Sequence, residues 1–129
     1  MKHVKHRNLA TALFLAVLAF LSAGVAHAVE DIVKAAATHD AEMLKHMKEA
    51  LKSGRAGNTE VLVTHARQAK KHASLRLGLG SSYSVENAAL HLRKAIKAGK
   101  SGDAAGATAH VEEAFAVLES EAPVDSRHF

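Results

Sequence analysis

The amino-acid sequence predicts an all-α fold: an up-down-up-down four-helix bundle formed by a duplicated αα-hairpin and preceded by a cleavable signal peptide. Three features lead to this prediction. Apolar residues recur at three- and four-residue intervals along four segments, as they do in amphipathic helices. Glycine-containing breaks separate these segments. One block of sequence is repeated, and two hairpins with short turns pack most simply as a four-helix bundle.

The first 28 residues have the organisation of a secretory signal peptide. A positive start precedes the apolar run Leu9–Leu21 and the small-residue cleavage pattern Ala26–Ala28. We therefore expect cleavage after Ala28, a mature domain over residues 29–120, a flexible tail over residues 121–129 and a periplasmic location. The alternative is an uncleaved membrane anchor, which the cleavage pattern disfavours. After cleavage we expect no association with a membrane.

The composition of the mature chain excludes several classes of function. Three of the 17 Lys and Arg lie in the leader but none of the 13 Asp and Glu, so the mature chain is nearly neutral. This balance, and the lack of a basic stripe with interleaved aromatic residues, argue against a nucleic-acid partner. The chain has no cysteine, which excludes thiolate zinc sites, iron–sulfur clusters and c-type haem attachment. Any metal must then be held by His, Met, Asp or Glu.

Apolar stripes predict four helices, near residues 30–53, 59–77, 84–98 and 103–120. The first break contains Gly54 and Gly57, the second is the loop Gly78–Ser82, and the third contains Gly99 and Gly102. The expected N-caps are Asn58 or Thr59, Ser84 and Asp103. The stripe residues are, in chain order, Val33, Ala36, Met43, Leu44, Met47 and Leu51; Leu62, Ala66, Ala69, Ala73 and Leu77; Val85, Ala89, Leu92 and Ile96; Ala104, Val111, Phe115 and Leu118.

An internal repeat relates the two hairpins. Residues 46–57 align with residues 91–102, and a histidine follows each block at the same distance. The matched pairs are Gly54 with Gly99, Gly57 with Gly102, His46 with His91 and His65 with His110. The repeat predicts that both hairpins have the same turn and place their histidines alike.

Six histidines lie on the same flank of their apolar stripes, at the boundary of the core: His39, His46, His65, His72, His91 and His110. They are placed symmetrically about the two hairpin turns, so each hairpin can present a His–His pair across its two helices. The first hairpin can present two such pairs, roughly 10 Å apart along the helix axis. With the other handedness of the bundle, His72 would instead approach His91. The leader histidines and His128 in the tail are excluded from this set.

This pattern predicts a metal site, with Cu(II) the favoured ion and nickel or zinc as alternatives, because imidazole suits all three and Cu(II) binds most tightly. Glu42 and Glu49 lie one turn from His46, and Glu113 lies one turn from His110. Met43 lies between His39 and His46, and a thioether with imidazoles suits Cu(I). Taken singly, each histidine is more simply a solvated residue and Met43 a core residue. The joint symmetry of the six favours metal binding.

The chain also resembles the periplasmic small metal-binding proteins (SmbP-like) from about His39 to Ser120. The resemblance is carried by the blocks Leu44–Lys52, Thr64–Ala73, Leu90–Gly99 and Ala109–Ala114. It implies a His-rich four-helix protein that binds copper and other divalent metals. The residues that match the repeated histidines of the family are His46, His65, His72, His91 and His110. Family members carry further histidines around the hairpin turns, where this chain has Ser53, Asn58, Ala98 and Asp103, so it resembles a histidine-depleted relative.

We therefore predict a non-enzymatic periplasmic protein that buffers or scavenges copper. The sequence contains no H-E-x-x-H, G-x-S-x-G or phosphate-loop motif, and its partners are expected to be metal ions. The main alternative is a helical interaction or structural module whose histidines only face solvent. A b-type haem held by Met and His is a weaker alternative.

Overall fold

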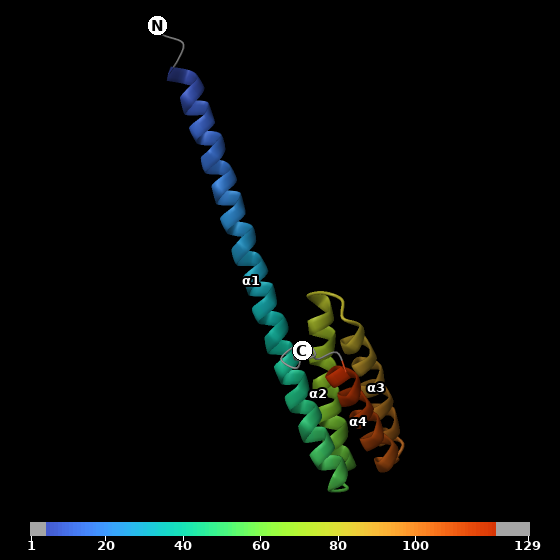
Figure 1. The fold of residues 1–129 in the computed structure, drawn as a ribbon. Helices are drawn as coiled ribbons and strands as arrows, with labels where there is room; N and C mark the ends of the chain where they lie inside the picture. Colours follow the sequence, from blue (N-terminus) through green and yellow to red (C-terminus); the bar gives the residue numbers. More distant parts are fainter. Residues whose placement is uncertain (1–4, 121–129) are drawn as a thin grey trace, which may run out of the picture. The chain divides into compact units, whose positions relative to one another are not determined.

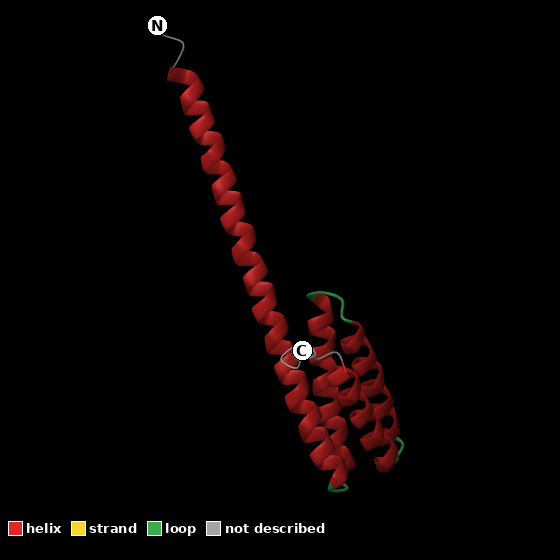
Figure 2. Cartoon of the chain, viewed as in Figure 1, coloured by secondary structure: helices red, strands yellow, loops and turns green. Residues whose placement is uncertain are grey.

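The computed structural model describes the backbone of residues 5–120 and the side chains of residues 24–120. It contains the helices α1 (Lys5–Arg55), α2 (Thr59–Gly78), α3 (Tyr83–Lys100) and α4 (Ala104–Ser120) (Figure 1). The described residues include no strand (Figure 2). The expected tail, and the side chains of the basic start and apolar run of the leader, lie outside the described part. No described helix is long and apolar enough to cross a bilayer.

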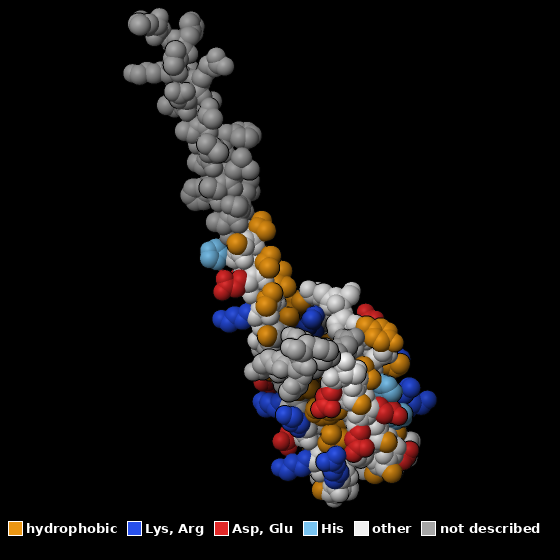
Figure 3. Space-filling view, in the orientation of Figure 1, with side chains coloured by type: hydrophobic (Ala, Val, Ile, Leu, Met, Phe, Trp, Pro, Cys, Tyr) orange, Lys and Arg blue, Asp and Glu red, His pale blue; other side chains and the backbone are white. Residues whose placement is uncertain are grey.

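The chain divides into two compact units, residues 1–34 and residues 35–129. The described side chains of the first unit include several exposed apolar residues: Val25, Val29, Ile32 and Val33. Figure 3 shows hydrophobic side chains, in orange, at the surface of this segment. The expectation that Val33 belongs to the core is therefore wrong, since it is 62% exposed.

The expected start of the first helix near residue 30 is also wrong, because α1 begins at Lys5. The sequence from Lys5 to Ser53 contains no proline and only one glycine, Gly24. A single glycine inside a helical pattern is tolerated at a cost of about 1 kcal/mol, so nothing in this segment ends a helix.

The second unit is the four-helix bundle. α3 packs against both α2 and α4, while α2 and α4 make far less contact. α1 reaches α2 through His46 and His65, and it reaches α4 through an ion pair between Arg55 and Glu112. Each helix therefore lies beside its neighbours in the sequence, and the last lies beside the first (Figure 1). This arrangement confirms the predicted packing of four helices.

Small side chains fill much of the bundle core. Its largest fully buried members are Met43, Met47, Leu62, Leu92 and Val111. Alanines occupy most of the other core positions: Ala50, Ala66, Ala69, Ala73, Ala88, Ala95, Ala107 and Ala114. Because alanine has only a methyl group, the helix axes can approach closely, and deletion or insertion of a methylene in such a core is felt.

The repeated glycines have equivalent conformations and contacts in the two hairpins. Gly57 and Gly102 have φ angles of +75° and +84°, the left-handed conformation that favours glycine after a helix. Gly54 lies so close to α4 that a Cβ atom there would overlap Thr108, and a Cβ atom on Gly99 would overlap Val63. Thr108 and Val63 are themselves matched by the repeat. The two hairpins are thus related by an approximate two-fold axis.

The N-caps agree with the sequence at two of three helices. Asn58 accepts a hydrogen bond from the Val61 amide at 3.2 Å, and Asp103 accepts one from the Gly106 amide at 2.8 Å. The expected cap Ser84 is wrong, because the α3 cap is Ser82, which accepts from the Val85 amide at 3.4 Å. Ser82 has the extended backbone that an N-cap requires, whereas Ser84 is buried inside the first turn.

Candidate metal centre

The bundle brings the six predicted histidines together in two clusters. Each ring is half-buried, as expected for residues at the boundary of the core. The α1–α2 cluster contains four of them: His39, His46, His65 and His72. The α3–α4 cluster contains His91 and His110. The histidines thus pair within each hairpin, which resolves the question of handedness that the sequence left open.

The α1–α2 cluster is a ladder of imidazoles. The Nδ1 atoms of His39 and His72 lie 3.2 Å apart, and those of His46 and His65 are also 3.2 Å apart. The two pairs are connected, because the rings of His46 and His72 stack with their centroids 5.8 Å apart and an angle of 20° between their planes. The four rings therefore form one continuous group between α1 and α2.

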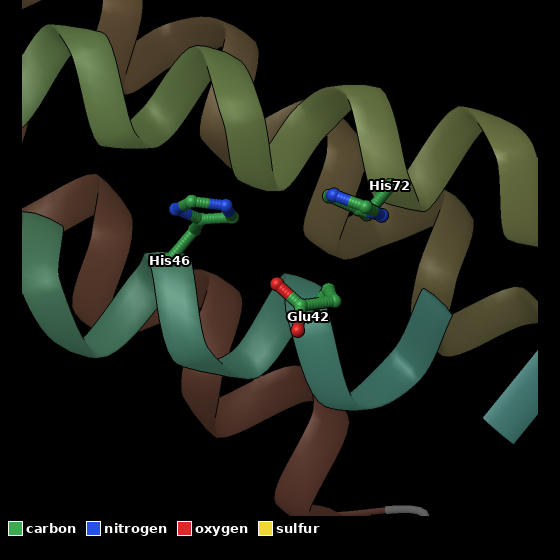
Figure 4. Close-up of side chains that lie close together, drawn as sticks. All are labelled: Glu42, His46 and His72. Atoms are coloured by element: carbon green, nitrogen blue, oxygen red, sulfur yellow. The ribbon is translucent and has the colours of Figure 1, made fainter. Parts of the chain in front are cut away.

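Glu42 adds a carboxylate to this ladder. It lies one helical turn before His46 on α1, and the side chains of Glu42, His46 and His72 lie close together between α1 and α2 (Figure 4). One ligand atom from each of Glu42, His46 and His72 can be chosen so that all three atoms lie within 4.8 Å of one another. The sequence placed Glu42 one turn from His46, but the hairpin packing was needed to distinguish it from Glu49, which joins no such group among the described residues.

The geometry of the ladder fits a transition-metal ion. Two nitrogens bound to one ion at about 2.0–2.1 Å lie about 2.9–3.4 Å apart in tetrahedral or square-planar coordination. The Nδ1–Nδ1 separation of 3.2 Å in each pair falls in this range. Without an ion, one nitrogen of each pair donates its N–H to the other. When a metal ion is bound, both nitrogens must direct their lone pairs at it, so binding requires neutral imidazoles.

The electrostatics of the ladder favour that neutral form. Burial lowers the pKa of His46 below its ordinary value of 6.5, and the neighbouring imidazoles His65 and His72 lower it further. Glu42 acts in the opposite direction, but its effect is smaller. His46 is therefore protonated less readily than a free imidazole, which favours the neutral ring that a metal ligand needs.

The α3–α4 cluster has a different donor set: two imidazoles and the carboxylate of Glu113. Glu113 Oε2 lies 2.6 Å from His110 Nδ1 and 2.8 Å from His91 Nδ1. The hydrogen bond from His110 is the main cause of the lowered pKa of Glu113. The contact between His110 and Glu113 has the geometry of a hydrogen bond. His91 Nδ1 is buried, and among the described residues it has no partner with hydrogen-bond geometry. Two nitrogens and one oxygen thus converge on a common point.

A comparison of matched positions in the repeat shows how the two clusters differ. Ser84 and Val117 occupy the positions that correspond to His39 and His72, so the second hairpin has only one His–His pair. The carboxylates differ as well. Glu42 corresponds to Asn87, and Glu113 corresponds to Gln68. The first hairpin consequently offers mainly nitrogen donors, whereas the second offers a two-histidine, one-carboxylate set.

Met43 is placed with the core. Only 1% of its surface is exposed, and it packs among the buried apolar residues of the bundle. This placement matches the alternative that Met43 fills the core between the helices, and its assignment as a Cu(I) ligand stays a prediction. The sequence pattern could not decide between a core residue and a Cu(I) ligand, because Met43 belongs to the apolar stripe and also lies next to the histidine flank.

Comparison with known proteins agrees with the geometry. The sequence profile of a family described as "Small metal-binding protein" matches residues 5–121, which is nearly the whole chain. A search among curated proteins found no match.

Proposed function

Because the chain belongs to the small metal-binding protein family, we propose that it is a non-enzymatic copper-binding protein that buffers or scavenges this metal in the periplasm. The proposal depends on one observation above all: two His–His pairs with Nδ1 atoms 3.2 Å apart lie side by side in the α1–α2 cluster. Among divalent ions of the first transition row, Cu(II) binds most tightly to nitrogen-rich sites.

The exposure of the sites suits a buffer. The His91 and His110 side chains are 21% and 31% exposed, and Glu113 is half-exposed. Ions held by half-exposed side chains at a bundle surface can exchange without unfolding of the domain. A structural site is normally enclosed on all sides, with its four positions filled by protein. Reversible uptake is therefore the behaviour that this architecture supports.

The periplasmic part of the proposal is supported by the leader pattern. Expression of the full chain, followed by mass spectrometry of the exported protein, tests it directly. We expect a mature chain that begins at Val29. A product that retains the leader and sediments with membranes would contradict this part while leaving the metal proposal intact.

Isothermal titration of the exported protein with Cu(II) at pH 7 tests metal binding. We expect dissociation constants in the micromolar range or below. Replacement of His46 and His72 by Gln should abolish Cu(II) binding at the α1–α2 cluster, and the matched variant His128→Gln should bind as the unmodified protein does. Absence of heat, or equal binding by both variants, would favour an interaction module over a metal-binding protein.

A further inference from the structure

The charges of the bundle are distributed unevenly among its helices. Residues 59–100, which span α2 and α3, contain eight Lys and Arg but only two Glu. α4 contains no Lys or Arg and three Glu. In the view of Figure 3, Asp and Glu side chains are visible on the side of the bundle that α4 occupies. A nearly neutral domain therefore has one strongly basic side.

The basic side is a continuous surface across two helices. Arg67, Lys70, Lys71 and Ser74 of α2 line a hollow of about 300 Å³ together with Ile96 of α3. On α3 the residues Arg93, Lys97 and Lys100 follow at intervals of four and three, on the flank next to Ile96. We call this surface the basic α2–α3 face, and its cations are Arg67, Lys70, Lys71, Arg93, Lys97 and Lys100.

These six cations are not neutralised within the domain. None of them forms an ion pair with another described residue, although cations of α1 do so at Lys45 and Arg55. The acidic residues of α2 and α3, Glu60 and Glu86, lie near the two ends of the face, in the first turns of their helices. Six like charges on one small face repel one another, and an anionic surface would relieve that repulsion.

The composition of the face indicates the kind of partner. It has no aromatic residue, and its apolar member Ile96 is half-buried, so it lacks the aromatic anchors that concentrate binding energy in protein interfaces. Four of the six cations are lysines, which act as point charges rather than as bidentate forks. A diffuse layer of phosphate groups suits such a face. The expected leader directs the chain to a compartment bounded by phospholipid and free of nucleic acid.

We propose that the basic α2–α3 face adsorbs to the surface of a membrane that contains anionic phospholipids. Adsorption leaves the metal clusters accessible, because His65 and His72 lie on the flank of α2 that faces α1. Likewise His91 lies on the flank of α3 that faces His110. The sequence predicted no membrane association because each helix alone carries only a short basic stripe, and the face exists once α2 and α3 lie side by side. This inference is independent of the proposed metal function.

Co-sedimentation of the exported, metal-free protein with vesicles tests the inference. Vesicles of phosphatidylglycerol and phosphatidylcholine are compared with vesicles of phosphatidylcholine alone, at low and at high salt. We expect binding to the anionic vesicles at low ionic strength, at least about tenfold weaker binding at 0.5 M salt, and none to the neutral vesicles.

A pair of matched variants locates the surface. In the first, four cations of the basic face are replaced: Arg67→Gln, Lys70→Gln, Lys97→Gln and Lys100→Gln. In the second, four exposed cations of α1 are replaced: Lys45→Gln, Lys48→Gln, Lys52→Gln and Arg55→Gln. Both variants lose the same charge, and circular dichroism checks that both are helical. A basic residue at an anionic surface contributes roughly fivefold to partitioning, so the first variant should bind at least about tenfold more weakly and the second less than about threefold.

Three results would overturn the inference. Equal loss in the two variants would show that net charge alone acts. Tighter binding to a double-stranded oligonucleotide than to vesicles with the same phosphate concentration would indicate a nucleic-acid surface. Sedimentation of the protein without vesicles at low salt would indicate that the basic face meets the acidic α4 of another copy.

Discussion

The Nδ1 atoms of His46 on α1 and His65 on α2 lie 3.2 Å apart, although the two residues are 19 positions apart in the chain. The separation matches two ligands on one metal ion. His72, nearly two turns after His65 on α2, stacks on His46, and Glu42 lies one turn before His46 on α1.

Glu42 and Glu49 should differ in their effect on copper binding. Both lie one turn from His46, but only Glu42 joins the α1–α2 cluster. We expect Glu42→Gln to weaken Cu(II) binding about tenfold or more, since loss of a ligand or of its partner carboxylate typically costs 10- to 100-fold. Glu49→Gln should change it less than about twofold. Competition with a chromogenic chelator measures both, and equal affinities would contradict the assignment of Glu42.

The two clusters should bind metal independently. Replacement of His91 and His110 by Gln should remove the α3–α4 site and leave binding at the α1–α2 cluster unchanged. Removal of copper with a chelator and stepwise reloading, followed by electron paramagnetic resonance, should show fewer nitrogen ligands for the α3–α4 site, where Glu113 supplies an oxygen. A double variant that loses both phases of the titration would mean that the two clusters are coupled.

Stability of the metal-free protein should fall below about pH 6.5. The pKa of His46 is lowered in the folded chain, mainly by burial. As the pH falls below 6.5, the unfolded chain therefore takes up a proton before the folded chain does, and the free energy of unfolding decreases until the lowered pKa is passed. Urea unfolding of His46→Gln should show a smaller decrease between pH 7 and pH 5, with His128→Gln as the control. Parallel pH profiles for all three proteins would refute the prediction.

Alanine at Gly54 or Gly99 should destabilise the bundle. A Cβ atom at Gly54 would overlap Thr108 and Leu62, and one at Gly99 would overlap Val63. Overpacking costs typically about 1–3 kcal/mol, which outweighs the gain of about 1 kcal/mol in helix propensity. Gly78→Ala is the matched control, because a Cβ atom there meets nothing within 4 Å. Its urea midpoint should be unchanged or higher, whereas both other variants should unfold at lower urea concentration.

Local patterns in the sequence determined the helices of the bundle and the symmetry of its histidines. The positions of the apolar residues fix which side of each helix is buried, and the repeat fixes that Gly57 and Gly102 close equivalent turns. The half-buried state of all six histidines follows from the same periodicity. These features depend on residues that are close together in the sequence, so the sequence alone is enough to predict them.

Only the tertiary structure decided which neighbour the histidine flanks face. The rotation of each helix about its axis is set by how small core residues pack, with close approaches at Gly54 and Gly99, and this information is spread over all four helices. The same packing selected Glu42 over Glu49 and buried Met43 in the core. It also joined the separate stripes of α2 and α3 into one basic face. A helix face is encoded locally, but what it meets depends on the other helices.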